Sequence, residues 1–233
     1  LGGLGVIHRF LSIEEQAAEV CEVAEQGGPV AAAVGIDEDY LDRTEAILNA
    51  GGDAVVLDVA HGHMERALDA VAEIRAEYDP ELIAGNVVTP DAVEDLYDSG
   101  ADCVKVGVGP GSHCTTREVA GAGYPQLSAV DECADRADEL GITVMADGGI
   151  QNSGDAAKAL MAGAETVMMG GFFAGTDEAP GRVVTHNGER FKRSRGMAST
   201  AANDDRDDKE IDVDSGEGVE ALTPYKGPLA PLT

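Results

Sequence analysis

Residues 143–171 read TVMADGGIQNSGDAAKALMAGAETVMMGG. Two apolar runs, at 143–147 and 166–169, flank an amphipathic stretch at 153–162, and a pair of glycines follows each run. This order is typical of a β-α-β unit whose parallel strands are buried on both faces and joined by a crossover helix. The glycine pairs follow the carboxyl ends of their strands, which is where an α/β barrel has its active site.

The same alternation extends over most of the chain. Seven β-α units are visible, one fewer than the eight that close a barrel. The predicted fold class is therefore α/β, a (β/α)8 TIM barrel whose first strand is missing from this fragment, with an open doubly wound sheet as the alternative. The further strands are predicted at 5–8, 30–34, 54–59, 82–86 and 103–107, and the further helices at 13–26, 39–50, 63–77, 91–99 and 127–140.

Local signals mark the ends of these helices. Ser12 with Glu15 three residues later has the spacing of a capping box, and Pro90 after Thr89 suits a first helical position. Glycines that favour a left-handed residue after a helix stand at 51, 100, 141 and 163.

Three segments are expected along the chain. Residues 1–181 form barrel strands 2 to 8, residues 182–222 form an active-site flap, and residues 223–233 form the C-terminal tail of the barrel domain. The flap is expected to be partly disordered, because residues 203–214 are dense in Asp and carry few residues that could form a core. A barrel that lacks one strand exposes two sheet edges, so the fragment alone is expected to be unstable and inactive.

The charge balance restricts the partners. Sixteen Lys and Arg stand against 44 Asp and Glu, which gives a formal net charge of -28. Such a charge repels phosphate backbones, so no nucleic-acid partner is expected. Acidic residues spread over helix faces, with more Arg than Lys, favour a protein from a halophile. An ordinary acidic cytosolic protein is the alternative.

The targeting signals and the cysteines narrow the protein class further. No run approaches the roughly 20 apolar residues of a membrane span, and no export signal is visible, so a cytoplasmic protein without membrane contact is expected. The four cysteines, at 21, 103, 114 and 133, lack paired metal-ligand spacing. Neither a disulfide framework nor a zinc site is predicted, and any functional thiol acts singly.

The loop GVGPGSHCTT at 107–116 carries the strongest chemical signal. Closely spaced glycines allow a tight turn whose amides and carbonyls face inward, and such a turn could hold a cation, a phosphate or a nucleophile. Cys114 at its end is a candidate thiolate nucleophile, since inward-facing amides favour the ionised form. The alternative is that Cys114 is a small buried apolar residue, which is the interpretation for the other three cysteines.

Polar residues after other strands suggest a ligand site at the same mouth. Asp147 is suited to sugar hydroxyls, with Gly148 and Gly149 allowing close approach of a ligand. Gly170 and Gly171 resemble the phosphate-binding loops that follow the last strands of barrels. Asp58 suits the ribose of a cofactor. His61 and His63 are spaced as a metal-binding pair, but no further ligand stands at the expected spacing.

Eight segments resemble the IMP dehydrogenase/GMP reductase family over almost the whole chain. The longest is VKVGVGPGSHCTTREVAGAGYPQLSAVDECAD, at 104–135. The others are GGLGVIHRFLSIEEQAAEV near the start, LDVAHGH at 57, AGNVVT at 84, ADGGIQNSGDAAKAL at 146, MMGGFFAGTDEAPG at 168, RGMAS at 195 and EGVEALTPYKG at 217.

This resemblance implies specific roles. Cys114 is the nucleophile that attacks C2 of the purine, with Thr116 and Glu217 moving protons. It also implies a GMP or IMP substrate, NADP(H) or alternatively NAD, a potassium ion and a homotetramer. The nucleotide would contact Ser112, Asp147, Gly149, Gly170, Gly171, Gly196 and Met197, the cofactor would contact Asp58 and Asn86, and the potassium ion would bind the carbonyls of Gly109, Gly111 and Cys114.

Two activities occur in this family, and the chain resembles GMP reductase more closely. The paired regulatory module that IMP dehydrogenases usually insert after the second barrel strand is absent between residues 24 and 30. The flap Arg-Tyr pair with which the dehydrogenases hydrolyse their intermediate is also missing, since Asp207 follows Arg206. The favoured function is NADPH-dependent reductive deamination of GMP to IMP through a Cys114 thioimidate. The alternatives are conversion of IMP to XMP with NAD, and an inactive nucleotide-binding barrel.

Overall fold

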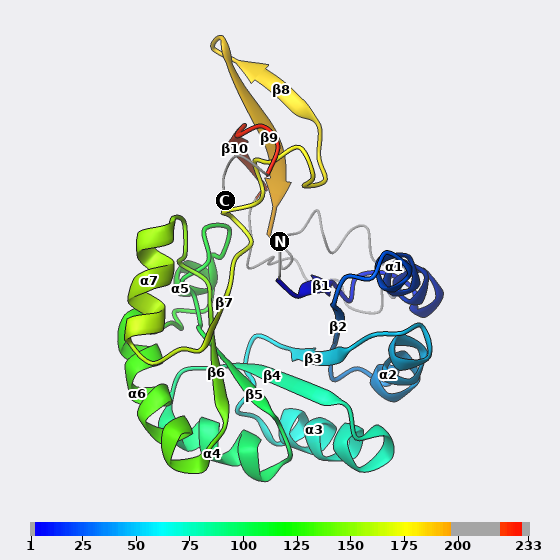
Figure 1. Cartoon of the computed structure of the whole chain (residues 1–233). Helices are drawn as coiled ribbons and strands as arrows, with labels where there is room; N and C mark the ends of the chain where they lie inside the picture. The colour runs from blue at the N-terminus through cyan, green and yellow to red at the C-terminus, as the bar shows by residue number, and fades with distance from the viewer. Residues whose placement is uncertain (1–2, 197–219, 230–233) are drawn as a thin grey trace.

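Seven parallel strands form one curved sheet with helices on its outer side (Figure 1). The computed structural model describes residues 3–196 and 220–229. The strands follow one another in chain order, so the seven predicted parallel strands are confirmed. They are β1 (Gly5–Ile7), β2 (Val30–Val34), β3 (Ala54–Asp58), β4 (Glu81–Val87), β5 (Cys103–Val106), β6 (Thr143–Asp147) and β7 (Thr166–Met168).

Helices connect these strands and cover the outer face of the sheet (Figure 1). All six expected helices form, with ends within about two residues of the prediction. A seventh short helix in the loop after β5 was not expected. The helices are α1 (Ile13–Glu25), α2 (Tyr40–Asn49), α3 (Glu65–Tyr78), α4 (Pro90–Asp98), α5 (Thr116–Val119), α6 (Gln126–Leu140) and α7 (Ser153–Met161).

The predicted helix ends are also confirmed. The Ser12 side chain accepts from the Glu15 amide while the Glu15 side chain accepts from the Ser12 amide, which forms the capping box. Gly141 ends α6 with a φ of 76°. Because a side chain at positive φ meets the backbone, glycine is the residue that ends such a helix with least strain.

Alternation along each strand divides the buried side chains between two layers. In β3, Val55 and Leu57 pack in the large cluster under the outer helices. Ala54 and Val56 face the inside of the sheet, in a smaller cluster that includes Met145. Both faces of the strand are therefore buried, which explains why its sequence is continuously apolar.

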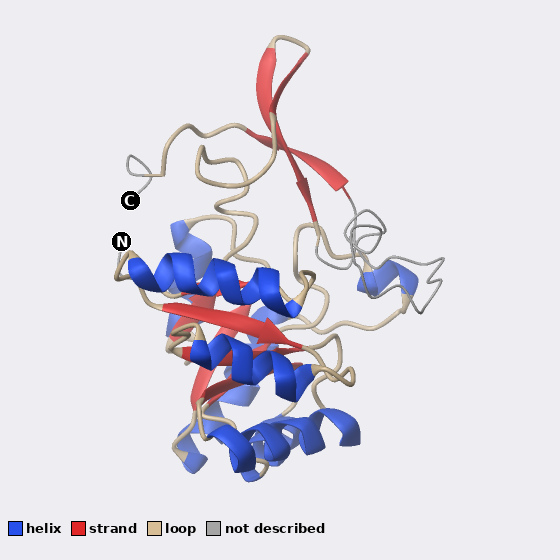
Figure 2. Cartoon of the chain, turned by 90° about the vertical axis from the view of Figure 1, so that its right-hand side faces the viewer, coloured by secondary structure: helices blue, strands red, loops and turns tan. Residues whose placement is uncertain are grey.

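A separate three-stranded antiparallel sheet stands away from the barrel wall (Figure 2). It consists of β8 (Val183–His186), β9 (Glu189–Arg195) and β10 (Glu220–Pro224) in the order β10-β9-β8. The expected flap at 182–222 contains β8, β9 and part of β10, and the expected boundary at 222 and 223 falls inside β10. The residues expected to be disordered, 203–216, lie outside the described residues.

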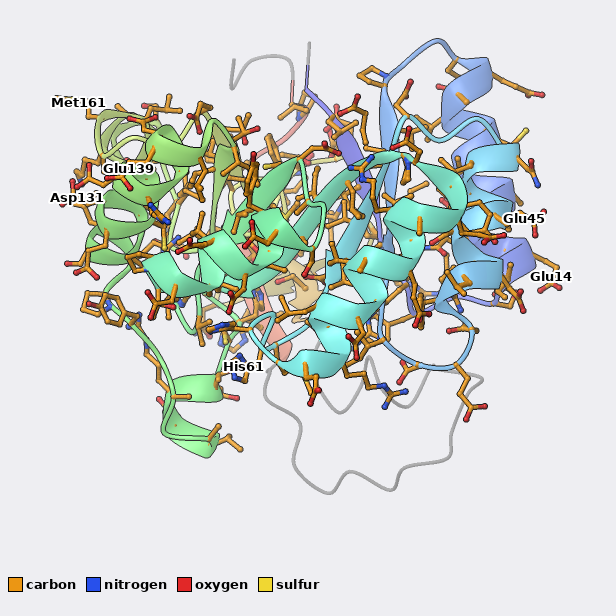
Figure 3. All side chains as sticks on the ribbon, turned by 90° about the horizontal axis from the view of Figure 1, so that it is seen from below. Glu14, Glu45, His61, Asp131, Glu139 and Met161 are labelled. Carbon is orange, nitrogen blue, oxygen red and sulfur yellow. The ribbon has the colours of Figure 1, made fainter. Side chains whose placement is uncertain are left out.

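Acidic side chains occupy the outer helices. Glu14, Glu45, Asp131 and Glu139 are exposed and point away from the sheet (Figure 3). These four carboxylates are therefore solvated on the outer surface and take no part in the buried core. Within the described ranges, no helix is long and apolar enough to cross a membrane.

Leu82 allows a direct test of the barrel core. It lies in β4 and is fully buried, whereas Leu127 at the start of α6 is 52% exposed. We expect Leu82→Ala to lower the free energy of unfolding by about 2–5 kcal/mol, because it removes buried methyl groups and leaves a cavity. Leu127→Ala should change it by less than about 0.5 kcal/mol. Equal effects of the two substitutions in denaturant titrations would contradict this assignment of the core.

Candidate functional site

The loops after the carboxyl ends of the strands enclose one cavity of about 1070 Å³. It is lined by residues 111–114 after β5, 147–151 after β6 and 168–171 after β7. Arg193 and Ser194 of β9 line its other side. Three strand-end loops and the antiparallel sheet thus meet at one site, and its volume suits a ligand of nucleotide size.

Cys114 lies in this cavity beside a hydroxyl group. Its Sγ is 3.1 Å from Oγ1 of Thr116, and its amide donates to the carbonyl of Gly111 at 3.0 Å. Thr116 begins the short helix α5. The thiol is half-buried within a turn and within reach of a group that can donate or accept a proton, which suits a nucleophile.

The other cysteines differ from Cys114. Burial, followed by the Glu165 carboxylate, raises the pKa of the Cys103 thiol to about 12. Burial, followed by Glu132, likewise raises the pKa of Cys133 to about 12. These two thiols are therefore protonated near neutral pH, and Cys21 is exposed on the outer helix α1. The interpretation of these cysteines as small buried residues thus fits Cys133 and the half-buried Cys103, and it is wrong for Cys21, which is exposed.

The paired glycines allow the loops to pack closely. Gly148 and Gly149 have φ values of 93° and 76°. A Cβ on Gly148 would lie 2.8 Å from Cγ of Pro110, and a Cβ on Gly171 would lie 2.7 Å from Oγ of Ser112. The loops after β5, β6 and β7 therefore approach to van der Waals distance, with Ser112 and Gly171 side by side.

Lys105 organises the floor beneath these loops. It lies in β5 with only 2% of its side chain exposed. Its ammonium donates to Asp58 Oδ1 at 2.8 Å and to Asp147 Oδ2 at 2.7 Å, and it also donates to Asn86 Oδ1. Strands β3, β4, β5 and β6 each contribute one of these four residues.

The charges in this network stabilise one another. Burial disfavours the charged form of Lys105, but Asp147 and Asp58 outweigh it and raise its pKa above the usual range. Burial also disfavours the charged form of Asp58, yet Lys105 holds the pKa of that carboxyl below its usual value. One cation is thus shared by two carboxylates at the barrel centre, and Lys105 and Asp58 both remain charged near neutral pH.

The network changes the interpretation of Asn86. Its amide nitrogen donates to the carbonyl of Gly107 at 2.7 Å and to Asp147 Oδ2 at 3.0 Å, while its oxygen accepts from Lys105. Asn86 therefore holds other site residues in place. Asp58 remains 44% exposed, so its carboxylate is accessible to a ligand hydroxyl as well as to Lys105.

Lys105 and Gln126 were not identified from the sequence. Gln126 donates to the carbonyls of Val106 and Asp147 at 2.9 and 3.1 Å, which ties the ends of β5 and β6 together. A signal for Lys105 was available, because a lysine inside an apolar strand is almost never buried without a partner. The sequence does not show which carboxylates those partners are.

Some of the remaining predicted residues lie in the described structure and others do not. Gly196 lines the cavity, whereas Met197 and Glu217 lie outside the described residues. Gly109 has a φ of 83°, and the carbonyl of Gly111 in the same loop accepts from the Cys114 amide. His63 pairs with Asp95 at 2.6 Å, and across residues 3–196 and 220–229 no three His, Cys, Asp or Glu side chains gather as a metal site.

Comparisons with known proteins match the whole chain. A family model described as IMP dehydrogenase / GMP reductase domain matches residues 1–233. Inosine-5'-monophosphate dehydrogenase from Nitrosopumilus maritimus is 51% identical over 213 residues, covering 87% of this chain and 45% of that protein. GMP reductase from Leishmania major is 46% identical over 213 residues, covering 87% of this chain and 43% of that protein.

A solved structure has the same fold. It is a cysteine-to-alanine variant of GMP reductase from Trypanosoma brucei in complex with guanosine 5'-monophosphate. The TM-score is 0.83 and the identity 45%, over 88% of this chain and 43% of that one. The chain therefore spans less than half the length of the relatives named here.

Removal of the Lys105 ammonium tests the network. We expect Lys105→Met to lower the free energy of unfolding by about 1–3 kcal/mol near neutral pH, because the partly exposed carboxylates of Asp58 and Asp147 lose their shared counter-charge. Lys158→Met should change it by less than about 1 kcal/mol, since Lys158 pairs with Asp155 at the surface.

The effect should depend on pH with a defined sign. The lowered pKa of Asp58 stabilises the folded protein above about pH 4, the pKa of an unfolded Asp, and this stabilisation is lost as pH falls through the folded pKa. The raised pKa of Lys105 stabilises it fully below about pH 10.4. The difference between wild type and Lys105→Met should be largest between these limits. A constant difference in denaturant titrations from pH 7 to pH 3 would contradict the assignment.

Proposed function

We propose that this chain, which belongs to the IMP dehydrogenase / GMP reductase family, forms the catalytic barrel of a purine-nucleotide oxidoreductase. In this proposal Cys114 is the nucleophile. The observation that carries the proposal is the Cys114 thiol, 3.1 Å from the Thr116 hydroxyl and facing the cavity at the strand ends. A thiol held beside a proton-exchanging group can add to an electrophilic ring carbon and later leave from it.

The cavity supports a nucleoside monophosphate as the substrate. Gly170 and Gly171 follow the last strand of the parallel sheet, and Gly171 lies beside Ser112, so backbone amides and a hydroxyl are available to a phosphate. Asp147 lines the same cavity and can accept from ribose hydroxyls, with Gly149 allowing close approach. Gly196 and Met197 would contact the base. The Trypanosoma brucei relative holds guanosine 5'-monophosphate.

We propose reductive deamination of GMP to IMP as the reaction. Cys114 adds to C2 of the purine, and ammonia leaves with a proton that Thr116 and Glu217 deliver. A bound NADPH supplies hydride to C2, and the thiolate is released from the same carbon. Asp58, with Asn86 held beside it, would receive the cofactor, and the carbonyls of Gly109, Gly111 and Cys114 would hold a potassium ion that fixes the loop.

The choice of the reductase rests on the sequence of the flap and of the loop after α5. Asp207 follows Arg206, so the Arg-Tyr pair that activates water in the dehydrogenases is missing. The run GYPQLSAVDECAD from Gly123, and Gly171 where Ser is commoner, also resemble GMP reductase.

IMP dehydrogenase is the second candidate. The runs EAPG at 178 and YKGPL at 225 resemble the dehydrogenases, and the relative from Nitrosopumilus maritimus bears that name. In that reaction the same thiolate would drive hydride from IMP to NAD. An inactive nucleotide-binding barrel is disfavoured, because Cys114, Thr116 and Glu217 are all present.

One absorbance assay separates these candidates. The full-length protein is incubated with GMP and NADPH, or with IMP and NAD, over a series of salt concentrations that also tests the proposed halophilic character. Oxidation of NADPH with release of ammonia supports the reductase, and reduction of NAD with formation of XMP supports the dehydrogenase. Absence of both activities in a protein that still binds GMP would identify an inactive barrel. Size-exclusion chromatography tests the proposed homotetramer.

Cys114→Ala tests the nucleophile. We expect turnover to be abolished while GMP affinity stays within a few-fold of wild type, because the proposed phosphate and ribose contacts lie on other residues. Cys21→Ala is the matched control, since that thiol is exposed on α1 and far along the chain from the site loops, and it should keep wild-type rates. Retained turnover in Cys114→Ala, measured by NADPH oxidation, would eliminate the mechanism.

Glu217→Gln separates proton delivery from binding. Expulsion of ammonia needs a proton on a poor leaving group, so loss of the acid should lower kcat for GMP and NADPH by about 100- to 10,000-fold. GMP affinity should remain within a few-fold of wild type, because a binding contact would mainly raise KM. Glu139→Gln, on the exposed face of α6, is the control with the same change in charge. A change confined to KM would show that Glu217 binds the nucleotide and delivers no proton.

A further inference from the structure

His113 lies beside the nucleophile and faces the same cavity, but neither the family resemblance nor the proposed reaction gives it a role. Its two ring nitrogens have different partners. Nδ1 is 3.1 Å from Oγ of Ser112 on the same loop, and Nε2 is 2.8 Å from Oγ of Ser194 in β9. The imidazole therefore joins the nucleophile loop to the antiparallel sheet across 81 residues of sequence.

The hydrogen bonds continue beyond Ser194. Its Oγ is 2.7 Å from Oγ1 of Thr223 and donates to the carbonyl of Ala221 at 3.4 Å, both in β10. A hydroxyl that donates onward in this way accepts from its other neighbour, so Nε2 of His113 carries the proton and Nδ1 accepts from Ser112. A continuous chain thus runs from Ser112 through His113 and Ser194 to the carbonyl of Ala221, and each bond polarises the next, while Thr223 donates to Ser194.

The remaining contacts of this sheet lead to another part of the barrel. Lys192 donates to the carbonyls of Thr176 and Asp177, Tyr225 donates to Asp177, and Lys226 donates to the carbonyl of Phe172. All of these acceptors lie in the segment after β7. The His113–Ser194 bond is thus a side-chain link that places the sheet relative to Cys114.

The position of this sheet matters for the proposed chemistry. Arg193 and Ser194 of β9 line the cavity on the side opposite the Cys114 loop. The position of the sheet therefore determines how a bound substrate lies against the thiol. A displacement of about 1 Å between a nucleophile and its target atom is enough to cost about 100-fold in rate.

We infer that His113 is a positioning residue that fixes the Cys114 loop against β9 and β10 through Ser194, so that the thiol keeps its position relative to the opposite wall of the cavity. This inference rests on the proposed function for its effect on rate. The link itself is independent of the reaction, because it depends only on the two hydrogen bonds of the imidazole.

Three substitutions at one position test the link. Glutamine places an amide N–H where Nε2 lies and keeps a donor for Ser194, asparagine reaches only as far as Nδ1, and alanine reaches neither. We expect His113→Ala and His113→Asn to lower kcat by about 10- to 100-fold with KM for the nucleotide within a few-fold of wild type. His113→Gln should restore most of kcat. His186→Ala, at the exposed end of β8, is the control for loss of a histidine.

Ser194→Ala provides the second arm. His113 and Ser194 act through one hydrogen bond, so the losses from the two substitutions should not multiply. We expect kcat of the double variant His113→Ala/Ser194→Ala to be no lower than that of the slower single variant. Multiplied losses would overturn the inference, and so would a rise in KM without a fall in kcat, which would make His113 a contact of the substrate phosphate. Equal loss in the Gln and Ala variants would also overturn it.

Amide hydrogen exchange keeps the test independent of the reaction. His113→Ala should increase exchange at residues 111–116 and 190–194 together, and His113→Gln should leave both close to wild type. If the wild type catalyses neither reaction but shows this paired change, the proposed function fails and the link stands. If exchange is unchanged in His113→Ala, the link fails whatever the activity.

Discussion

One ammonium group shared by two carboxylates underlies the rest of the site. Lys105 is buried in β5 and holds Asp58 from β3 and Asp147 from β6, with Asn86 from β4 closing the group. A lysine in this position is costly unless all of its protons are used, and here each of them has an oxygen acceptor. The carboxyl ends of β3, β4, β5 and β6 are thereby held together at one edge of the sheet, so the loops that follow them start from fixed positions.

The parallel wall was predictable because its signals are local. The apolar runs at β2 and β6 were predicted with the observed ends, and the Ser12 capping box and Gly141 terminus formed as expected. The antiparallel sheet was not predicted from the sequence, because β9 reads ERFKRSR and is too polar to resemble a buried strand. Its pairing with β10 depends on residues far along the chain, which no local pattern records.

The residues of the site likewise differ in whether local sequence predicts them. Cys114 and the glycine pairs were identified from their spacing within single loops, and the structure gathers them around one cavity. The Lys105 network, Gln126 and the His113–Ser194 bond each join residues 19 or more positions apart, so only the folded chain brings them together. Sequence motifs therefore located the candidate reactive groups, and tertiary structure was needed to find the groups that orient them.

The strictly sequential order of β1 to β7 has a consequence for synthesis on the ribosome. Each strand pairs with the one made just before it, so the parallel sheet can grow strand by strand as the chain leaves the ribosome. The charges of the site do not follow this order, because Asp147, one of the two carboxylates that pair with Lys105, is made 42 residues later. Until β6 arrives, the nascent barrel contains a cation with half of its final counter-charge. Translation pauses between β5 and β6 would prolong this state, in which the Lys105 ammonium lacks one of its two carboxylates.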